Sequence, residues 1–190
     1  MHTSRPATLA QWLTYIEQQH PAGIAMGLER VRHVADAMGM QAPAHRTIVV
    51  GGTNGKGSTV AFIESIARAA GWRVGSYTSP HLHHYNERVR INGEPVDDAA
   101  LVAAFEAVEQ ARGETALTYF EYGTLAALHL FAGAELDLAV LEVGLGGRLD
   151  AVNIVDADVA VITTVDIDHT DLLGEDRESI GAEKAGIIRG

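Results

Sequence analysis

The sequence contains no cysteine, so it can form neither disulfide bridges nor thiolate metal sites. It also has few basic residues: 14 Lys and Arg stand against 25 Asp and Glu, and the formal net charge is -11. No run rich in Lys or Arg interrupts this balance, which argues against nucleic acid as a partner. Residues 1–20 are too polar for a signal peptide or a membrane anchor. These absences predict a cytoplasmic protein that binds neither nucleic acid nor membrane.

The apolar residues that are present are sufficient for one hydrophobic core. The chain has 190 residues, of which 47% are apolar and 21% are charged. A chain of this size buries one core and a short appendage, but hardly two full domains. We therefore expect a single globular unit without internal repeats.

Apolar periodicity and turn residues predict strands that alternate with helices. We expect strands at 46–50, 73–77, 138–143 and 159–165, and helices at 8–19, 27–40, 58–70, 98–112, 120–133 and 176–188. Residues 78–96 are predicted to form a long polar loop, and loops of that length are often functional. This alternation indicates an α/β fold with a mostly parallel sheet flanked by helices, whose ligands bind beyond the carboxyl ends of the strands.

The sharpest motif is the run Gly-Gly-Thr-Asn-Gly-Lys-Gly-Ser at 51–58, between an expected strand and an expected helix. Its glycines allow backbone N–H groups and the helix N-terminus to face a phosphate, Lys56 adds a charge, and Ser58 is a magnesium ligand type. The run departs from Gly-x-x-x-x-Gly-Lys-Ser/Thr in its shorter glycine spacing and in the extra Gly57. We interpret residues 51–58 as a phosphate loop and use that name below; an ordinary glycine-rich turn is the alternative. The predicted nucleotide-binding residues are Thr53, Asn54, Gly55, Lys56, Gly57 and Ser58.

This variant loop resembles the nucleotide loop of the folylpolyglutamate synthases, a branch of the Mur ligase superfamily. Further segments match that family in the same order, at 24–30, 78–82, 86–88, 118–121, 142–150 and 168–184. The resemblance covers nearly the whole chain and implies a P-loop NTPase-like Mur ligase central domain that is incomplete here. Family members are longer than this chain. We therefore expect residues 1–190 to be the N-terminal part of the ATP-binding domain, with short helices over 8–40, and the C-terminal ligase domain to be absent.

Glu142 ends an apolar strand, where a carboxylate has little structural reason to stand, and we expect it to lie near the phosphate loop as a magnesium ligand. From the residues alone, Ser79 before a proline is a turn residue. His169 is either a solvated loop histidine or a ligand oriented by neighbouring aspartates, Asp166 and Asp168. The resemblance implies two magnesium ions held by Ser58, Ser79, Glu142 and His169.

Lys184 lies on the helix expected at 176–188, and the residues alone favour a solvated lysine on an amphipathic face. The resemblance reverses this preference, because the family's lysine at this place is often carbamylated. That reaction needs a neutral amine, hence a pKa lowered by burial or by nearby positive charge. The catalytic residues implied in total are Lys56, Glu142, His169 and Lys184.

Phe120 has two interpretations, a flat surface for a pterin or the first core aromatic of its helix. The resemblance to bifunctional members of the family favours the first and implies a dihydropteroate pocket. It also implies that residues 79–96 form a mobile lid over the pteridine site. The implied lining of the pocket is Ile24, Met26, Thr118, Phe120, Asp150, Ala151 and Asn153.

The implied function is that of an ATP- and Mg²⁺-dependent ligase, monomeric when full length, that joins L-glutamate to dihydropteroate and to folate polyglutamates through an acyl phosphate. The chain alone is expected to bind nucleotide poorly and to be inactive. One alternative is a Mur-type peptidoglycan amino-acid ligase, which predicts a loop without Gly57 and a UDP-sugar site. A P-loop kinase or GTPase would need an Asp-x-x-Gly motif after a strand, which is missing from the right place. A non-catalytic nucleotide-binding module is the third alternative.

Overall fold

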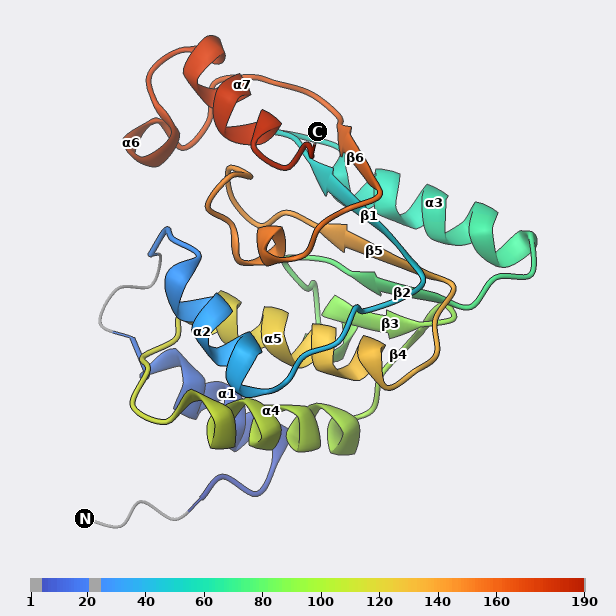
Figure 1. The fold of residues 1–190 in the computed structure, drawn as a ribbon, viewed down its shortest axis with the longest axis vertical. Coiled ribbons are helices and arrows are strands. Elements are labelled where there is room, and N and C mark those ends of the chain that lie inside the picture. Colours follow the sequence, from blue (N-terminus) through green and yellow to red (C-terminus); the bar gives the residue numbers. More distant parts are fainter. Residues whose placement is uncertain (1–4, 21–24, 190) are drawn as a thin grey trace.

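The computed structural model describes residues 5–20 and 25–189, and six strands of that part of the chain form one sheet (Figure 1). The order across the sheet is β4-β3-β2-β5-β1-β6. Strands β2, β5, β1 and β6 are parallel, whereas β3 and β4 add an antiparallel edge. The predicted mostly parallel sheet is confirmed. Its strands are β1 (Arg46–Gly51), β2 (Val74–Tyr77), β3 (Val89–Ile91), β4 (Glu94–Pro95), β5 (Leu138–Glu142) and β6 (Val159–Ile162).

Helices cover both faces of the sheet (Figure 1). Helix α3 (Lys56–Ala69) packs on one face against β2 and β5, and α5 (Tyr119–Ala132) lies on the other. A second layer packs on α5 and consists of α1 (Leu9–Glu17), α2 (Glu29–Ala37) and α4 (Asp98–Arg112). The short helices α6 (Thr170–Leu173) and α7 (Arg177–Ala185) follow β6 and lie beyond its carboxyl end. Two 3₁₀ turns, η1 (Tyr85–Arg88) and η2 (Ala151–Ile154), complete the described elements.

The buried elements explain the apolar runs of the sequence. Strand β5 has neighbours on both sides, and all five of its residues are buried, as expected for a central parallel strand. Helix α5 is enclosed between the sheet and α4, and nine of its 14 residues are buried. A capping box fixes its start, because Thr118 and Glu121 each bond the other's backbone N–H with a side-chain oxygen. Phe120 is thereby held within the first turn of α5.

The segment 78–96 differs from the loop that the sequence predicts. It contains η1 and two short strands, and β3 pairs with β2 through Tyr77↔Val89 and Gly75↔Ile91. The Glu87 carboxylate closes the preceding turn by accepting the backbone N–H groups of residues 82, 83 and 84. Strands of two and three residues are too short to leave a periodic pattern among glycine, proline and asparagine. Part of the expected lid is therefore tied to the sheet edge.

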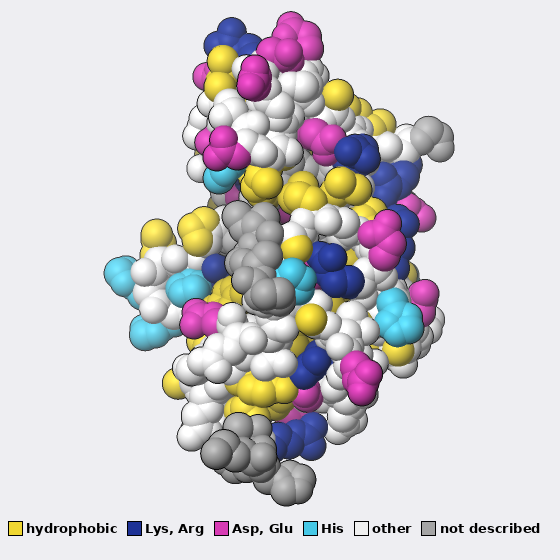
Figure 2. All heavy atoms as spheres, turned by 90° about the vertical axis from the view of Figure 1, so that its left-hand side faces the viewer, with side chains coloured by type: hydrophobic (Ala, Val, Ile, Leu, Met, Phe, Trp, Pro, Cys, Tyr) yellow, Lys and Arg dark blue, Asp and Glu magenta, His cyan; other side chains and the backbone are white. Residues whose placement is uncertain are grey.

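Two element ends are set by tertiary contacts. The strand expected to reach residue 165 ends at Ile162, because Thr163 and Thr164 turn to bond the phosphate loop. The helix expected to reach residue 188 ends at Ala185 with Gly186 as its cap. Within the described ranges, no helix has the length and apolar character needed to cross a bilayer. On the face shown in Figure 2, acidic and basic side chains are interspersed rather than separated into broad patches.

Candidate functional site

The run at 51–58 forms a loop between β1 and α3, as its sequence predicts. Gly55 has φ of 82° and caps α3 without a side-chain hydrogen bond, so the first N–H groups of the helix have no side-chain partner at the cap. Such an N-terminus favours a bound anion. Lys56 extends back over the loop and donates from Nζ to the Gly52 carbonyl oxygen at 3.0 Å. The loop thus presents a helix N-terminus and a cation at the carboxyl end of β1.

The segment after β6 braces this loop. Thr53 N–H donates to the Thr164 carbonyl at 2.9 Å, and Thr163 Oγ1 donates to the Asn54 carbonyl at 2.6 Å. Gly52 has φ of 148°, and a Cβ there would lie 1.9 Å from Thr163 Oγ1. Only glycine fits at this position, because the conformation and the close approach both exclude a side chain.

Glu142 is buried at the carboxyl end of β5, beside the phosphate loop. Its Oε2 accepts the backbone N–H of Ser79 at 3.0 Å. Burial raises the pKa of Glu142, although the Ser79 bond and the charges of Lys56 and Arg88 oppose the rise. A cavity of about 610 Å³, here called the phosphate cavity, is lined by Ser58, Ser79 and Glu142. Three of the four predicted metal ligands therefore line one cavity, and two hydroxyls with one carboxylate are the hard oxygen donors that suit Mg²⁺.

His169 does not line the phosphate cavity. It precedes α6 in a left-handed conformation (φ 48°, ψ 46°), and its side chain is 53% exposed. Its Nε2 is 3.8 Å from Asp168 Oδ2, whereas Asp166 pairs with Arg177 at 2.8 Å. Within residues 5–20 and 25–189, no three His, Asp or Glu side chains gather closely enough to hold a metal ion. The role of His169 as a ligand stays a prediction.

Lys184 is only 3% exposed, in contrast to the solvated lysine that the residues alone favour. Burial lowers its pKa, the charge of Lys56 lowers it further, and Asp168 acts in the opposite direction. Gly147 makes this burial possible, because a Cβ there would lie 2.7 Å from the Glu183 carbonyl and 3.0 Å from the Lys184 Cα. The environment of Lys184 thus favours the neutral amine that carbamylation requires.

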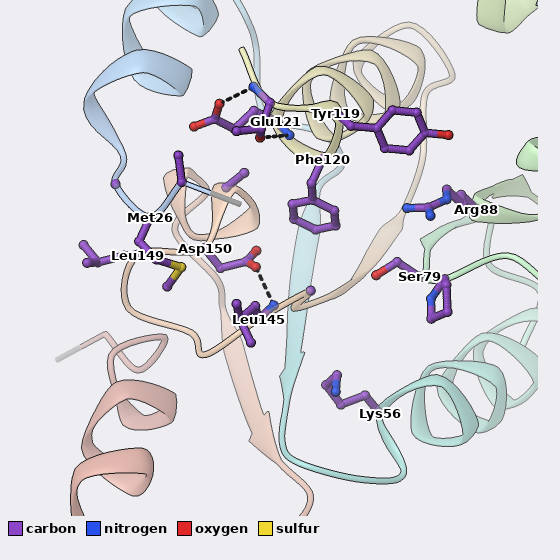
Figure 3. Close-up of a pocket in the computed structure, with 16 residues that line it drawn as sticks. Met26, Lys56, Ser79, Arg88, Tyr119, Phe120, Glu121, Leu145, Leu149 and Asp150 are labelled. Atoms are coloured by element: carbon purple, nitrogen blue, oxygen red, sulfur yellow. Dashed lines mark hydrogen bonds between the residues drawn. The ribbon is translucent and has the colours of Figure 1, made fainter. Parts of the chain in front are cut away.

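A second cavity of about 360 Å³, here called the ring cavity, opens between α5, the segment after β5 and the residues before α2 (Figure 3). Lys56 and Ser79 line it as well, so it adjoins the phosphate loop. Five predicted substrate residues contribute to its wall: Met26, Thr118, Phe120, Asp150 and Ala151. Asn153 does not line it and instead donates from Nδ2 to the carbonyls of Arg148 and Gly186. The predicted residue Ile24 lies outside the described residues.

Phe120 forms an aromatic wall of the ring cavity. Its ring centroid is 6.0 Å from that of Tyr77, and a Cβ on Gly144 would lie 2.6 Å from its Cζ. Phe120 is only partly buried, unlike the neighbouring Tyr122 in the core. The two interpretations of Phe120 therefore both describe part of its position, since it packs on Tyr77 and also borders the cavity.

Asp150 supplies a buried carboxylate to the ring cavity. It accepts the N–H groups of Leu145 at 2.9 Å and Val152 at 3.0 Å. Burial raises its pKa to about 6, although these bonds and the charge of Lys56 oppose the rise. A carboxyl group with this pKa titrates just below neutral pH.

The sequence motifs assign no role to three further residues of the ring cavity, Arg88, Tyr119 and Glu121. Glu121 pairs with Arg30 at 2.8 Å, and Arg30 also donates to the Ala25 carbonyl at 3.0 Å, which holds the 25–27 segment against the start of α5. Arg88 belongs to a segment that matches the folylpolyglutamate synthases. The sequence of an expected loop, however, does not indicate where an arginine side chain in it points. Only the pairing of β3 with β2 turns this segment toward the cavity.

Comparison with known proteins gives a consistent family. Residues 50–190 match the Mur ligase middle domain. The chain is 59% identical over 181 residues to the dihydrofolate synthase/folylpolyglutamate synthase of Escherichia coli K12, which covers 95% of this chain and 43% of that protein. The Haemophilus influenzae protein of the same name is 52% identical over 189 residues, covering 100% of this chain and 43% of its own length.

Solved structures agree with these matches. E. coli FolC in complex with DHPP and ADP superposes with a TM-score of 0.95 at 58% identity, over 97% of this chain and 44% of that one. The Yersinia pestis bifunctional folylpolyglutamate synthase/dihydrofolate synthase complexed with AMPPNP and Mn superposes with a TM-score of 0.93 at 55% identity, over 98% of this chain and 46% of that one. The chain thus spans less than half the length of these relatives. It belongs to the Mur ligase middle domain family and, within it, is similar to the dihydrofolate synthase/folylpolyglutamate synthases.

Proposed function

We propose that this protein takes part in ATP-dependent ligation of L-glutamate to dihydropteroate and to folate polyglutamates in folate biosynthesis. One observation carries the proposal: Lys56 of the phosphate loop lines the ring cavity, and Ser79 lines both the ring cavity and the phosphate cavity. A pterin-sized aromatic ligand and a nucleotide phosphate would therefore meet at one place. The relatives named for this activity and the solved complexes with ADP and AMPPNP support the same assignment.

The ring cavity suits a flat, donor-rich ring. Phe120 offers an aromatic face, and Met26, Leu145 and Leu149 supply apolar contact. The Asp150 carboxylate accepts hydrogen bonds from ring N–H groups when it is ionised. In this proposal the pterin lies between Phe120 and Asp150, with the remainder of the substrate directed toward Lys56.

The phosphate loop binds the ATP phosphates through the α3 N-terminus and Lys56. Ser58, Ser79 and Glu142 fit a magnesium ion, which when bound neutralises phosphate charge. His169 and a carbamylated Lys184 are proposed to complete the metal environment, and the second ion implied by the resemblance belongs to the same proposal. The proposal also places the protein in the cytoplasm and treats the full-length protein as a monomer. It assigns residues 1–190 to the N-terminal part of the ATP-binding domain.

The proposed reaction has two steps. A carboxylate oxygen of the substrate attacks the γ-phosphorus of ATP, and ADP leaves, which gives an acyl phosphate. The amine of L-glutamate then attacks the acyl carbon, a proton is lost from nitrogen, and inorganic phosphate leaves with the formation of an amide. Lys56 stabilises the negative charge on the transferred phosphoryl group in the first step.

The test is a ligation assay on the protein purified as its gene encodes it. We expect ADP release that requires dihydropteroate, L-glutamate and Mg²⁺ together, with a product heavier by one glutamyl residue in mass spectrometry. Release of ADP with a UDP-linked peptidoglycan precursor instead would assign the protein to the peptidoglycan ligases. Nucleotide binding without ADP release under any of these conditions would leave a binding module. The 190-residue chain alone, assayed in parallel, is expected to be inactive.

A further inference from the structure

Arg88 places a positive charge in the wall of the ring cavity that no ion pair of the described residues neutralises. It is 9% exposed, and it takes part in none of the salt bridges formed within residues 5–20 and 25–189. A nearly buried charge is costly unless an opposite charge or several hydrogen bonds compensate it. The position therefore suits an anion supplied from outside the chain.

Neutral neighbours hold the Arg88 side chain in place. Its Nε donates to His81 Nδ1 at 2.8 Å, and its guanidinium carbon lies 5.3 Å from the Tyr85 ring centroid and 5.6 Å from that of Tyr119. These contacts use Nε and the flat face of the guanidinium. The Arg88 side chain also interacts with the Tyr77 hydroxyl, and its charge acts on the Glu142 carboxylate without forming an ion pair with it. Figure 3 shows that its end points into the ring cavity, between Phe120 and Ser79. A fixed guanidinium end is the group that binds a carboxylate through two parallel hydrogen bonds.

The two polar ends of the ring cavity carry opposite charge types. Asp150 lies on one side, and Arg88 with Lys56 lies on the other, with Phe120 between them (Figure 3). We propose that Arg88 binds the substrate carboxylate that is to be activated and directs it toward the phosphate loop. This inference rests on the proposed function. The ligand class is an aromatic ring system with hydrogen-bond donors at one end and a carboxylate at the other.

A phosphate group of the nucleotide is the competing anion. Arg88 lines the ring cavity but not the phosphate cavity, whereas Ser79 lines both. Lys56 also lines only the ring cavity, but it belongs to the phosphate loop, whereas Arg88 lies outside that loop and faces Phe120 (Figure 3). This location assigns Arg88 to the carboxylate of the ring ligand. The two anions differ in a measurable way, since only the carboxylate makes affinity depend on the charge of the ring ligand.

The experiment compares dihydropteroate with its neutral carboxamide analogue, without ATP, by titration against the protein purified as its gene encodes it. The variants are Arg88→Met and Arg88→Lys. The matched control is Arg46→Met, which removes an exposed arginine at the end of β1 that is farther from the phosphate loop. We expect Arg88→Met to weaken binding of dihydropteroate on the order of tenfold to a hundredfold while binding of the carboxamide stays unchanged. Arg88→Lys is expected to lie between wild type and Arg88→Met, and Arg46→Met to match wild type.

The outcomes separate the alternatives. If neither affinity changes in Arg88→Met and Arg88→Lys, the inference is overturned and the proposed function still stands. Equal loss of both ligands also overturns it, because Arg88 then only shapes the cavity. Weaker binding of AMPPNP with an unchanged ratio assigns Arg88 to the nucleotide instead. If wild type binds neither ring ligand, the proposed substrate itself is wrong. Should Arg88→Met fail to fold by circular dichroism, the ratio in Arg88→Lys decides.

Discussion

At the scale of single residues, Phe120 separates a role in binding from a role in packing. If its ring contacts a pterin, Phe120→Leu raises the KM for dihydropteroate several-fold, because leucine fills volume but lacks an aromatic face worth about 0.5–1.5 kcal/mol. The KM for ATP stays the same. Phe131→Leu is the matched control, since Phe131 is a fully buried core residue of the same helix. It is expected to lower the melting temperature without changing either KM. A Phe120→Leu variant that behaves like this control would remove Phe120 from the pterin site.

A substitution at Glu142 can separate the effect of its charge on Mg²⁺ binding from its effect on the stability of the fold. Its buried carboxylate has a raised pKa, so its ionised form is disfavoured in the folded protein. Glu142→Gln keeps the shape and removes the charge, and we expect the Mg²⁺ concentration for half-maximal activity to rise by about tenfold or more. The melting temperature is expected to change little or to increase. The Mg²⁺ titration of activity and a thermal melt check both points, and an unchanged titration would place Glu142 outside the metal site.

Asp150 predicts a particular dependence of stability on pH. Its pKa rises from 3.8 to about 6 on folding, so the folded state holds the proton more tightly than the unfolded state. This contribution to stability is present below the unfolded pKa and is lost as pH rises through about 6. We expect the free energy of unfolding of the wild type to fall by roughly 1–3 kcal/mol between pH 4.5 and pH 7.5, relative to that of Asp150→Asn. Urea unfolding of both proteins at the two pH values measures this difference. A difference that does not change with pH would contradict the raised pKa.

At the scale of elements, the helix caps test whether α7 matters for the reaction. Asp176 caps α7, which carries Lys184, by accepting Ser179 N–H at 2.7 Å. Asp97 caps α4 in the same way, by accepting Ala100 N–H at 2.8 Å. We expect Asp176→Ala and Asp97→Ala each to lower the melting temperature by roughly 2–4 °C. Only Asp176→Ala is expected to reduce kcat, because only α7 presents Lys184. Equal effects on kcat would argue against a role for α7 in the reaction.

The predictability of an element from the sequence depends on its length and enclosure. Strand β5 and helix α5 are recognisable because they are buried nearly all round, so their sequences are continuous apolar runs. Strands β3 and β4 have three and two residues. β4 pairs locally with β3, whereas β3 pairs with β2, whose residues are more than ten positions away. No local pattern encodes such a contact. The same limit applies to Arg88, because its side chain reaches the ring cavity only when β3 pairs with β2.

At the scale of the whole molecule, the outer strand of the sheet predicts self-association. In the described part of the chain β6 pairs only with β1, and Val159 is 49% exposed. Unpaired strand edges pair with other chains, and a charged side chain there opposes this. We expect sedimentation velocity to show association of the 190-residue chain as its concentration rises, and Val159→Lys to reduce it. Phe62→Lys, on the exposed face of α3, is the control. If this control reduces association equally, apolar exposure rather than the strand edge is the cause.

The sequence by itself determined the α/β class, the phosphate loop and the position of Glu142 at a strand end. Each follows from short-range rules: glycines allow the loop conformation, an apolar run requires burial, and parallel strands gather their carboxyl ends at one edge. The family resemblance supplied candidate substrate residues, five of which line the ring cavity.

Only the tertiary structure decided which side chains share a cavity and which are buried. Lys184 has the pattern of a solvated lysine in the sequence, yet the close approach of Gly147 to its helix accompanies burial. Burial lowers its pKa, and the charge of the distant Lys56 lowers it further. Asn153 faces backbone carbonyls rather than the ring cavity, because a 3₁₀ turn directs its side chain. Burial and charge at a site are properties of neighbours in space, and those neighbours are brought together only when the sheet forms.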